Sequence, residues 1–349
     1  MKNKNFFKIG LIYFVAMICI AILFALGSFG IIQNEFLASF LIQIVVMTAI
    51  PLLLYTLLVS KKIKITFKDT GFLKFSFKML LISIALGFVL YFINSFVAAF
   101  SSSVIHGLGY ESISSSQSIT LDYKFLLKEF ALTAVLPGIC EEFLHRGIML
   151  NAAKKHGNPR YCLIISSILF GLTHLNVNQF FYATILGFLM GVTAFASDSI
   201  YPCIIIHFMN NFLSCYFSYG TSLNWPLANL VANIENFFMS NFLLFIVSSV
   251  VGILLLSLAY LFLIKKLLFE RTRIEMTQVL KELNILDVPL DQAQDRIKQI
   301  NDVLTSSKSI KGIVPKSDVK VNFKDNIFII SSIILGVVIT ISSFIWGIL

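Results

Sequence analysis

The chain has 349 residues, of which 57% are hydrophobic and only 13% are charged, and its formal net charge is +9. A soluble globular protein has about 25% charged residues, so this composition excludes a soluble enzyme and predicts an integral membrane protein surrounded by a lipid bilayer. The positive charge does not indicate a nucleic-acid partner, because the basic residues follow the pattern of membrane loops described below.

Apolar stretches follow one another along the chain, and most reach the roughly 17–25 residues that a helix needs to cross the hydrocarbon core. There are nine of them, at residues 6–29, 36–59, 79–100, 130–150, 161–175, 180–196, 200–217, 242–264 and 327–349. The three between 161 and 217 are shorter, but we expect them to span as well, because a polypeptide at that depth has to be helical. The predicted fold class is all-α: a polytopic membrane helical bundle of about nine spans with a short cytoplasmic helical insertion.

Lysine and arginine occur in alternate loops. The loops at residues 28–35, 101–123, 176–179 and 218–241 contain neither residue, whereas the loops between them are basic, except for the short loop around Asp198, which has no Lys or Arg. Basic loops stay on the cytoplasmic side of a membrane, so we expect a cytoplasmic N-terminus. The abundance of Lys, Ile, Asn and Phe is typical of AT-rich bacterial genes and favours a bacterial cell membrane.

This pattern divides the chain into four parts. We expect residues 1–118 to hold spans one to three, 119–268 to form a membrane core of spans four to eight, 269–324 to form a cytoplasmic helical hairpin and linker, and 325–349 to form span nine. The hairpin is predicted from apolar residues at helical spacing with charges on the opposite face. It is interpreted either as a solvated tether or as a segment that binds a regulatory partner.

Two glutamates and an arginine lie within the fourth span. Each costs about 2.5–3.5 kcal/mol at the centre of a membrane, so such residues face protein or water and mark functional sites. Glu142 and Arg146 are four residues apart, share a helix face, and are expected to form an ion pair. Glu141 points about 100° away and has no arginine, so we assign it to acid–base chemistry and assign Glu142 to holding Arg146.

Further polar residues lie on the next spans. His174 follows Phe170 by four residues, and His207 precedes Asn211 by four, so each pair shares a face. At about 1.5 Å per residue, Glu141 and His174 both lie roughly 20 Å from the cytoplasmic ends of their helices, and we expect them to meet at one level.

Two kinds of chemistry are open to this set of residues. Glu141 and His174 could polarise a water molecule while His207 and Asn211 donate hydrogen bonds to an oxyanion. Alternatively, Glu141, His174 and His207 could bind zinc and leave its fourth position to water. The sequence has no His-Glu-x-x-His motif, and its five cysteines lack the Cys-x-x-Cys spacing of zinc clusters.

The three polar motifs resemble the signature of the CPBP family of intramembrane proteases, which includes the type II CAAX prenyl endopeptidases and the bacteriocin-processing Abi proteins. The signature Glu-Glu-x-x-x-Arg, Phe-x-x-x-His, His-x-x-x-Asn reads here as Glu141-Glu142-x-x-x-Arg146, Phe170-x-x-x-His174 and His207-x-x-x-Asn211, within residues 120–220. One departure is His145, where an aromatic residue commonly precedes the arginine. His145 could tune Glu141 or add a metal ligand.

The resemblance implies that Glu141 and His174 activate water and that His207 and Asn211 stabilise the oxyanion, with the metal question open. The implied substrates are membrane-associated peptides or proteins, either CAAX-type tails or bacterial leader, bacteriocin or pheromone precursors. The alternative is a non-catalytic immunity or scaffold protein of the same fold that binds a toxin or sensor partner. A proton-coupled transporter is disfavoured, because no internal repeat is visible.

Overall fold

The computed structural model describes residues 4–111, 122–285, 295, 298, 313–315, 319 and 322–348, and every regular element within them is a helix. The first half contains α1 (Lys4–Ser28), α2 (Glu35–Phe40), η1 (Leu41–Ala49), α3 (Ile50–Tyr55), η2 (Thr56–Ser60), α4 (Ile63–Asp69), α5 (Phe77–Gly107), α6 (Tyr123–Glu129) and η3 (Phe130–Val135). The second half contains α7 (Leu136–Glu142), η4 (Phe143–Ala152), η5 (Ala153–Lys155), α8 (Pro159–Leu172), α9 (Val177–Ser197), α10 (Tyr201–Gly220), α11 (Ala228–Met239), α12 (Phe242–Ile285) and α14 (Phe323–Ile348).

The helices identify an integral, multi-pass membrane protein. Six helices in the described part of the chain are long and apolar enough to cross a membrane: Lys4–Ser28, Phe36–Ser60, Phe77–Gly107, Val177–Ser197, Leu243–Gln278 and Phe323–Gly347. The other three predicted spans are helical too, but the fourth is divided into α- and π-helical segments and α8 has only 14 residues. The all-α class is therefore confirmed, whereas the count of nine spans is not.

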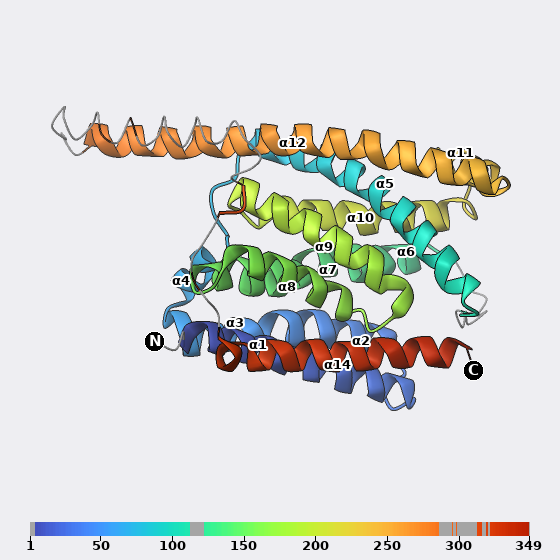
Figure 1. Ribbon diagram of the computed structural model, residues 1–349, viewed down its shortest axis with the longest axis horizontal. Coiled ribbons are helices and arrows are strands. Elements are labelled where there is room, and N and C mark those ends of the chain that lie inside the picture. The colour runs from blue at the N-terminus through green and yellow to red at the C-terminus, as the bar shows by residue number, and fades with distance from the viewer. Residues whose placement is uncertain are drawn as a thin grey trace.

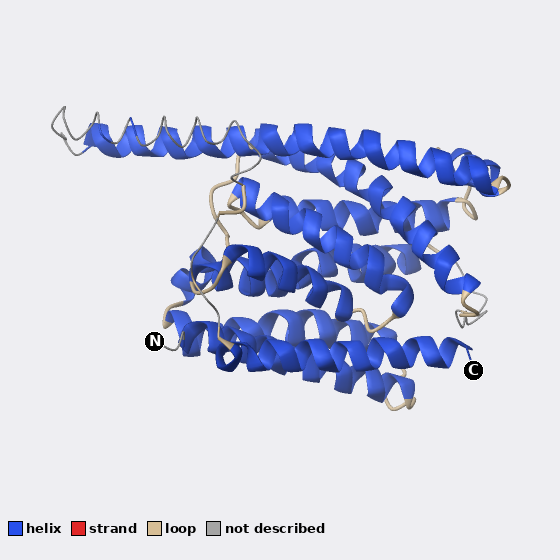
Figure 2. Ribbon diagram, in the orientation of Figure 1, coloured by secondary structure: helices blue, strands red, loops and turns tan. Residues whose placement is uncertain are grey.

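The helices that carry the predicted polar residues lie in the middle of the bundle. In Figure 1, α7, α8, α9 and α10 lie between α5 and α12 on one side and α1, α3 and α14 on the other. The contacts agree, because α9 packs against both α8 and α5, and α14 packs against both α1 and α8. Figure 2 shows that the loops are gathered at the two ends of this bundle. Flanking helices on both sides thus separate the polar residues from the surrounding lipid.

Ion pairs between loops show which loops share an end of the bundle. Lys155 lies 2.6 Å from Asp69 of α4, and Lys154 lies 3.2 Å from Asp198, which connects α9 to α10. Arg271 of α12 approaches the same Asp198 to 3.9 Å. In Figure 1, α4 lies near the N-terminus and the C-terminus lies at the opposite end. Basic loops that are far apart in sequence therefore meet at the end that holds the N-terminus.

The eighth predicted span does not end where the cytoplasmic insertion was expected to begin. Helix α12 runs unbroken for 44 residues from Phe242 to Ile285, about 66 Å at 1.5 Å per residue. It extends beyond the rest of the bundle on the side of the N-terminus (Figure 1). The span and the first part of the predicted hairpin are thus one helix. Most of the second part lies outside the described residues.

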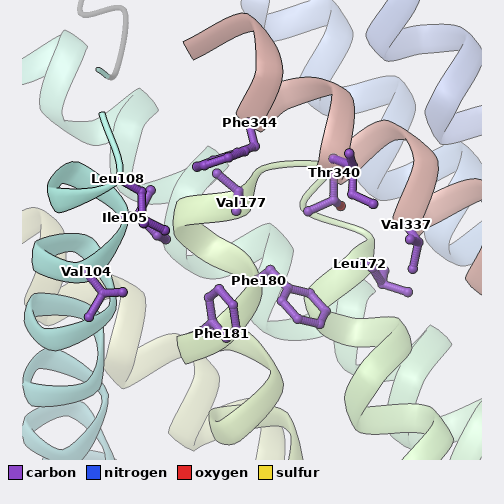
Figure 3. A pocket seen from close by; sticks show the side chains of 11 residues that line it. Val104, Ile105, Leu108, Leu172, Val177, Phe180, Phe181, Val337, Thr340 and Phe344 are labelled. Atoms are coloured by element: carbon purple, nitrogen blue, oxygen red, sulfur yellow. The ribbon is translucent and has the colours of Figure 1, made fainter. Parts of the chain in front are cut away.

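An apolar cavity of about 350 Å³ lies beside the turn that joins α8 to α9. Figure 3 shows Phe344 and Thr340 of α14 facing Phe180 and Phe181 of α9, with Val104 at the side of α5. No ionisable side chain lines the cavity. It belongs to the hydrophobic packing around the polar centre described next.

Candidate active site

The ion pair expected within the fourth span is present. The Nη1 atom of Arg146 donates to Oε1 of Glu142 over 2.7 Å, and both side chains are fully buried. The second amino group of Arg146 donates to the carbonyl of Gly187 over 3.2 Å, and its guanidinium carbon lies 4.3 Å from the centre of the Phe170 ring. Arg146 thus joins η4 to α8 and α9, which explains how a fully buried guanidinium is tolerated.

A glycine on α9 makes this close approach feasible. A Cβ atom at Gly187 would lie 3.1 Å from Cδ1 of Phe170 and 3.3 Å from Cα of Ser167. Any side chain there would press against α8. Gly187 therefore lets α8 and α9 pack closely while its carbonyl accepts the arginine hydrogen bond.

Glu141 has a different environment from Glu142, as the sequence predicted. No arginine contacts it; instead its Oε1 accepts a hydrogen bond of 2.8 Å from Nε2 of Gln43, which lies on η1. Its Oε2 lies 3.9 Å from Nε2 of His207. Glu141 is 8% exposed, whereas Glu142 is fully buried.

His207 lies between the two carboxylates. Its Nδ1 is 2.8 Å from Oε1 of Glu142 and its Nε2 faces Glu141. An ionised carboxylate can only accept, so Nδ1 must carry a proton in this contact. The Nε2 atom is then a donor only when the imidazole is doubly protonated. Glu142 therefore contacts His207 as well as Arg146, a second contact that the sequence did not predict.

His174 is held through one of its ring nitrogens. Helix α8 ends at Leu172, and His174 lies in the turn that follows. Its Nδ1 lies 2.9 Å from the carbonyl oxygen of Phe170. A carbonyl oxygen only accepts, so Nδ1 is the protonated nitrogen and Nε2 of the neutral ring keeps a lone pair. His174 can thus accept a proton from a neighbouring water molecule.

The Phe170 ring connects these groups. Its centre lies 5.2 Å from that of His174 and 5.5 Å from that of His207, both nearly perpendicular, while the Arg146 guanidinium lies over the ring. It also contacts the ring of His145 at 5.0 Å. The phenylalanine of the second motif therefore fixes the orientation of the histidines by direct contact.

Asn211 is oriented by hydrogen bonds at both ends of its amide. Its Nδ2 donates to the carbonyl of Thr133 over 2.8 Å, and its Oδ1 accepts from Asn210 over 2.9 Å. Thr133 lies in the π-helical segment η3. A π-helix interrupts the i→i+4 ladder of the α-helix and is found frequently at functional sites. Asn210 is in turn held by Asn94 of α5 at 3.2 Å.

His145 does not contact Glu141 as expected. The side chain is fully buried, its Nδ1 lies 3.2 Å from the Tyr13 hydroxyl, and its Nε2 lies 3.5 Å from the Thr173 hydroxyl. Both ring nitrogens are therefore engaged by α1 and by the end of α8. The spacing of four residues did not identify these partners, because they come from neighbouring helices.

A cavity of about 480 Å³ lies next to these residues. Its walls include His174, His207 and Asn211, and they carry no Lys, Arg, Asp or Glu side chain. Glu141 does not line the cavity, but His207 lines it and approaches Glu141. The predicted residues thus form one cluster with an adjoining space large enough for a short stretch of peptide.

A zinc ion held by Glu141, His174 and His207 would need all three side chains to converge. Among the residues that the structure describes, no group of three or more His, Cys, Asp and Glu side chains is placed to hold a metal ion. Glu141 and His207 approach each other to 3.9 Å. The ring of His174 is held separately, by the hydrogen bond between its Nδ1 and the carbonyl oxygen of Phe170. Zinc binding by these three residues stays a prediction.

Three residues of the site were missed from the sequence. Gln43, Asn94 and Tyr13 come from η1, α5 and α1, and all three are buried. Each is a polar side chain within a long apolar stretch, which is a usable signal, because a polar group in a membrane span needs a partner. Their partners could not be assigned, because spacing reports neighbours within one helix only.

The fold and the site together define a multi-pass membrane protein with a buried glutamate–histidine centre. Residues 124–213 match the family model described as "Type II CAAX prenyl endopeptidase Rce1-like". This segment belongs to the CPBP family of intramembrane proteases, and it includes all eight site residues predicted from the sequence. No curated protein and no solved structure matches the chain.

Proposed function

We propose that this protein is an intramembrane endopeptidase that hydrolyses peptide bonds of membrane-associated substrates. The observation that supports this proposal most strongly is the cluster of Glu141, His174 and His207 beside a cavity. All three residues lie within the segment that matches a protease family. Both histidines have Nδ1 engaged elsewhere and present Nε2 to this region, but in different environments. His174 has an unprotonated Nε2 and His207 has Nε2 next to a carboxylate, which are complementary roles for acid–base chemistry.

In the proposed mechanism, a water molecule attacks the carbonyl carbon of the scissile bond. Its proton passes to Glu141 or to Nε2 of His174, and the carbonyl oxygen becomes the oxyanion. Asn211 donates to this oxyanion through an N–H, and His207 donates through Nε2 when its ring is doubly protonated. Such preorganised donors contribute about 3–4 kcal/mol each. Proton transfer to the leaving amine then breaks the C–N bond and gives one carboxyl and one amino product.

Glu142 and Arg146 support this chemistry without taking part in it. Glu142 holds the Nδ1 side of His207, and Arg146 balances the charge of Glu142. The proposed substrates are CAAX-type tails or bacterial leader, bacteriocin or pheromone precursors. The proposed setting is a bacterial cell membrane with the basic end of the bundle in the cytoplasm.

The test is the substitution Glu141→Gln in the purified protein, assayed on a reporter peptide that the wild type cleaves in detergent or vesicles. We expect cleavage to fall at least about 10²-fold, since acid–base groups contribute 10²–10⁴-fold. Glu129→Gln is the matched control, because Glu129 lies at the end of α6, directly before the fourth span, and its carboxylate accepts from the Tyr219 hydroxyl rather than from a predicted site residue. Wild-type cleavage by Glu141→Gln would refute the assignment.

A further inference from the structure

Gln43 has the one side-chain amide within the long apolar helix Phe36–Ser60. Its side chain is 8% exposed and donates to Glu141 over 2.8 Å. The amide oxygen Oε1 has no hydrogen-bond partner in the described part of the chain. The contact with Glu141 is therefore the hydrogen bond that holds this buried amide, and burial of an amide is costly unless it is hydrogen-bonded.

The chemistry of the contact determines which group of the Gln43 amide faces Glu141. An ionised carboxylate has no proton to donate, so the group of Gln43 that faces it must be the NH₂. A neutral donor orients the carboxylate and leaves its charge in place. Glu142 is treated differently, because Arg146 balances its charge.

The local structure keeps Gln43 at this position. Gln43 lies in the π-helical segment η1, which packs against α7, the helix that carries Glu141. The Thr48 hydroxyl donates to the backbone carbonyl of Gln43 over 3.1 Å. The backbone at Gln43 is thus tied within its own segment while the side chain crosses to the next helix.

We propose that Gln43 is a positioning residue for Glu141, so that the N-terminal helices complete the reactive centre. Gln43 lies outside residues 124–213, the segment that matches the protease family. The inference rests on the proposed function of Glu141. By holding Oε1, Gln43 fixes the rotation of the carboxylate and leaves Oε2 directed toward His207.

The contact is tested first without any substrate, by a double-mutant cycle on thermal stability in detergent. Gln43→Met removes the donor and Glu141→Met removes the acceptor, and each single change leaves a buried polar group unpaired. The double variant leaves neither group unpaired. We therefore expect the fall in its melting temperature to be smaller than the sum of the two single falls, and the difference to be at least about 2 °C. Gln43→Met combined with Tyr260→Phe, which removes a hydroxyl bonded to Leu189 on another face of the bundle, should be additive. Additivity of the Gln43 and Glu141 changes would overturn the contact.

The positioning role is tested by kinetics on a reporter peptide that the wild type cleaves. Gln43→Met should lower kcat about 10- to 100-fold and leave KM within about twofold, because a misplaced reactive group slows the chemical step. The same substitution at the exposed Gln33, in the loop that precedes this helix, should change neither constant. An unchanged kcat in Gln43→Met, or a loss confined to KM, would overturn the role. The proposed function would stand in that case if Glu141→Gln were still inactive.

Discussion

The sharpest energetic prediction concerns Arg146. Its guanidinium is fully buried, donates to Glu142 over 2.7 Å and to Gly187 over 3.2 Å, and lies over the Phe170 ring. Arg146→Met keeps an unbranched apolar stem but removes the guanidinium, and it leaves Glu142 as a buried charge with only His207 beside it. Breaking one partner out of a buried pair costs about 3–5 kcal/mol. At about 2 °C for each kcal/mol, the expected fall in melting temperature is roughly 6–10 °C.

The measurement is a thermal melt of the purified variants in one detergent, with Arg271→Met as the matched control. Arg271 is also paired, with Glu275 at 2.8 Å and with the carbonyl of Phe195 at 3.1 Å, but the side chains of Arg271 and Glu275 are partly exposed, at 29% and 45%. An exposed pair contributes about 0–1 kcal/mol, so this control should melt within about 2 °C of the wild type. Glu141→Gln should also melt close to the wild type, because the new amide oxygen still accepts from Gln43. Equal melting of Arg146→Met and Arg271→Met would refute the assignment of Arg146 as a structural cation.

Three further outcomes are expected. Reporter domains fused after residues 70, 157 and 270 should be cytoplasmic, and those fused after 110 and 228 should be external, because the basic loops share one end of the bundle. The reverse pattern at 157 and 110 would mean that the orientation in the membrane is inverted. Thorough chelation should leave cleavage unchanged if Glu141 and His174 act directly on water, whereas stoichiometric zinc whose return alone restores activity would favour the metal alternative. His145→Phe should keep cleavage within about threefold and lower stability by about 1–2 kcal/mol, since Tyr13 loses its buried partner; a folded but inactive variant would make His145 part of the chemistry.

The polar residues of the central segment were predictable because a membrane makes their partners nearly obligatory. Glu142 and Arg146 are four residues apart in an apolar span, and the structure contains that ion pair. The separation of the two glutamates followed from the 100° step between neighbouring residues of a helix. The depth of each residue in its span predicted that Glu141 and His174 would lie at one level.

The partners contributed by other helices were not predictable. Gln43 reaches Glu141 across 98 positions of sequence, and Asn94 reaches Asn210 across 116. Helix packing determines such contacts, and one chain without relatives does not reveal that packing. The π-helical segments η1, η3 and η4 added a second difficulty, because they change the angle between successive side chains and the sequence gives no clear sign of them.

The shortness of α8 has a consequence for the supply of water. Its 14 residues span only about 21 Å, against a hydrocarbon core of about 30 Å. If α8 begins at one surface of the membrane, the turn at residues 173–176 lies below the opposite surface, where its backbone groups need protein or water as partners. His174 lies in that turn and lines the polar cavity. Water, which every hydrolysis consumes, would then reach the site through a shallow depression from one side of the bilayer rather than across its full thickness.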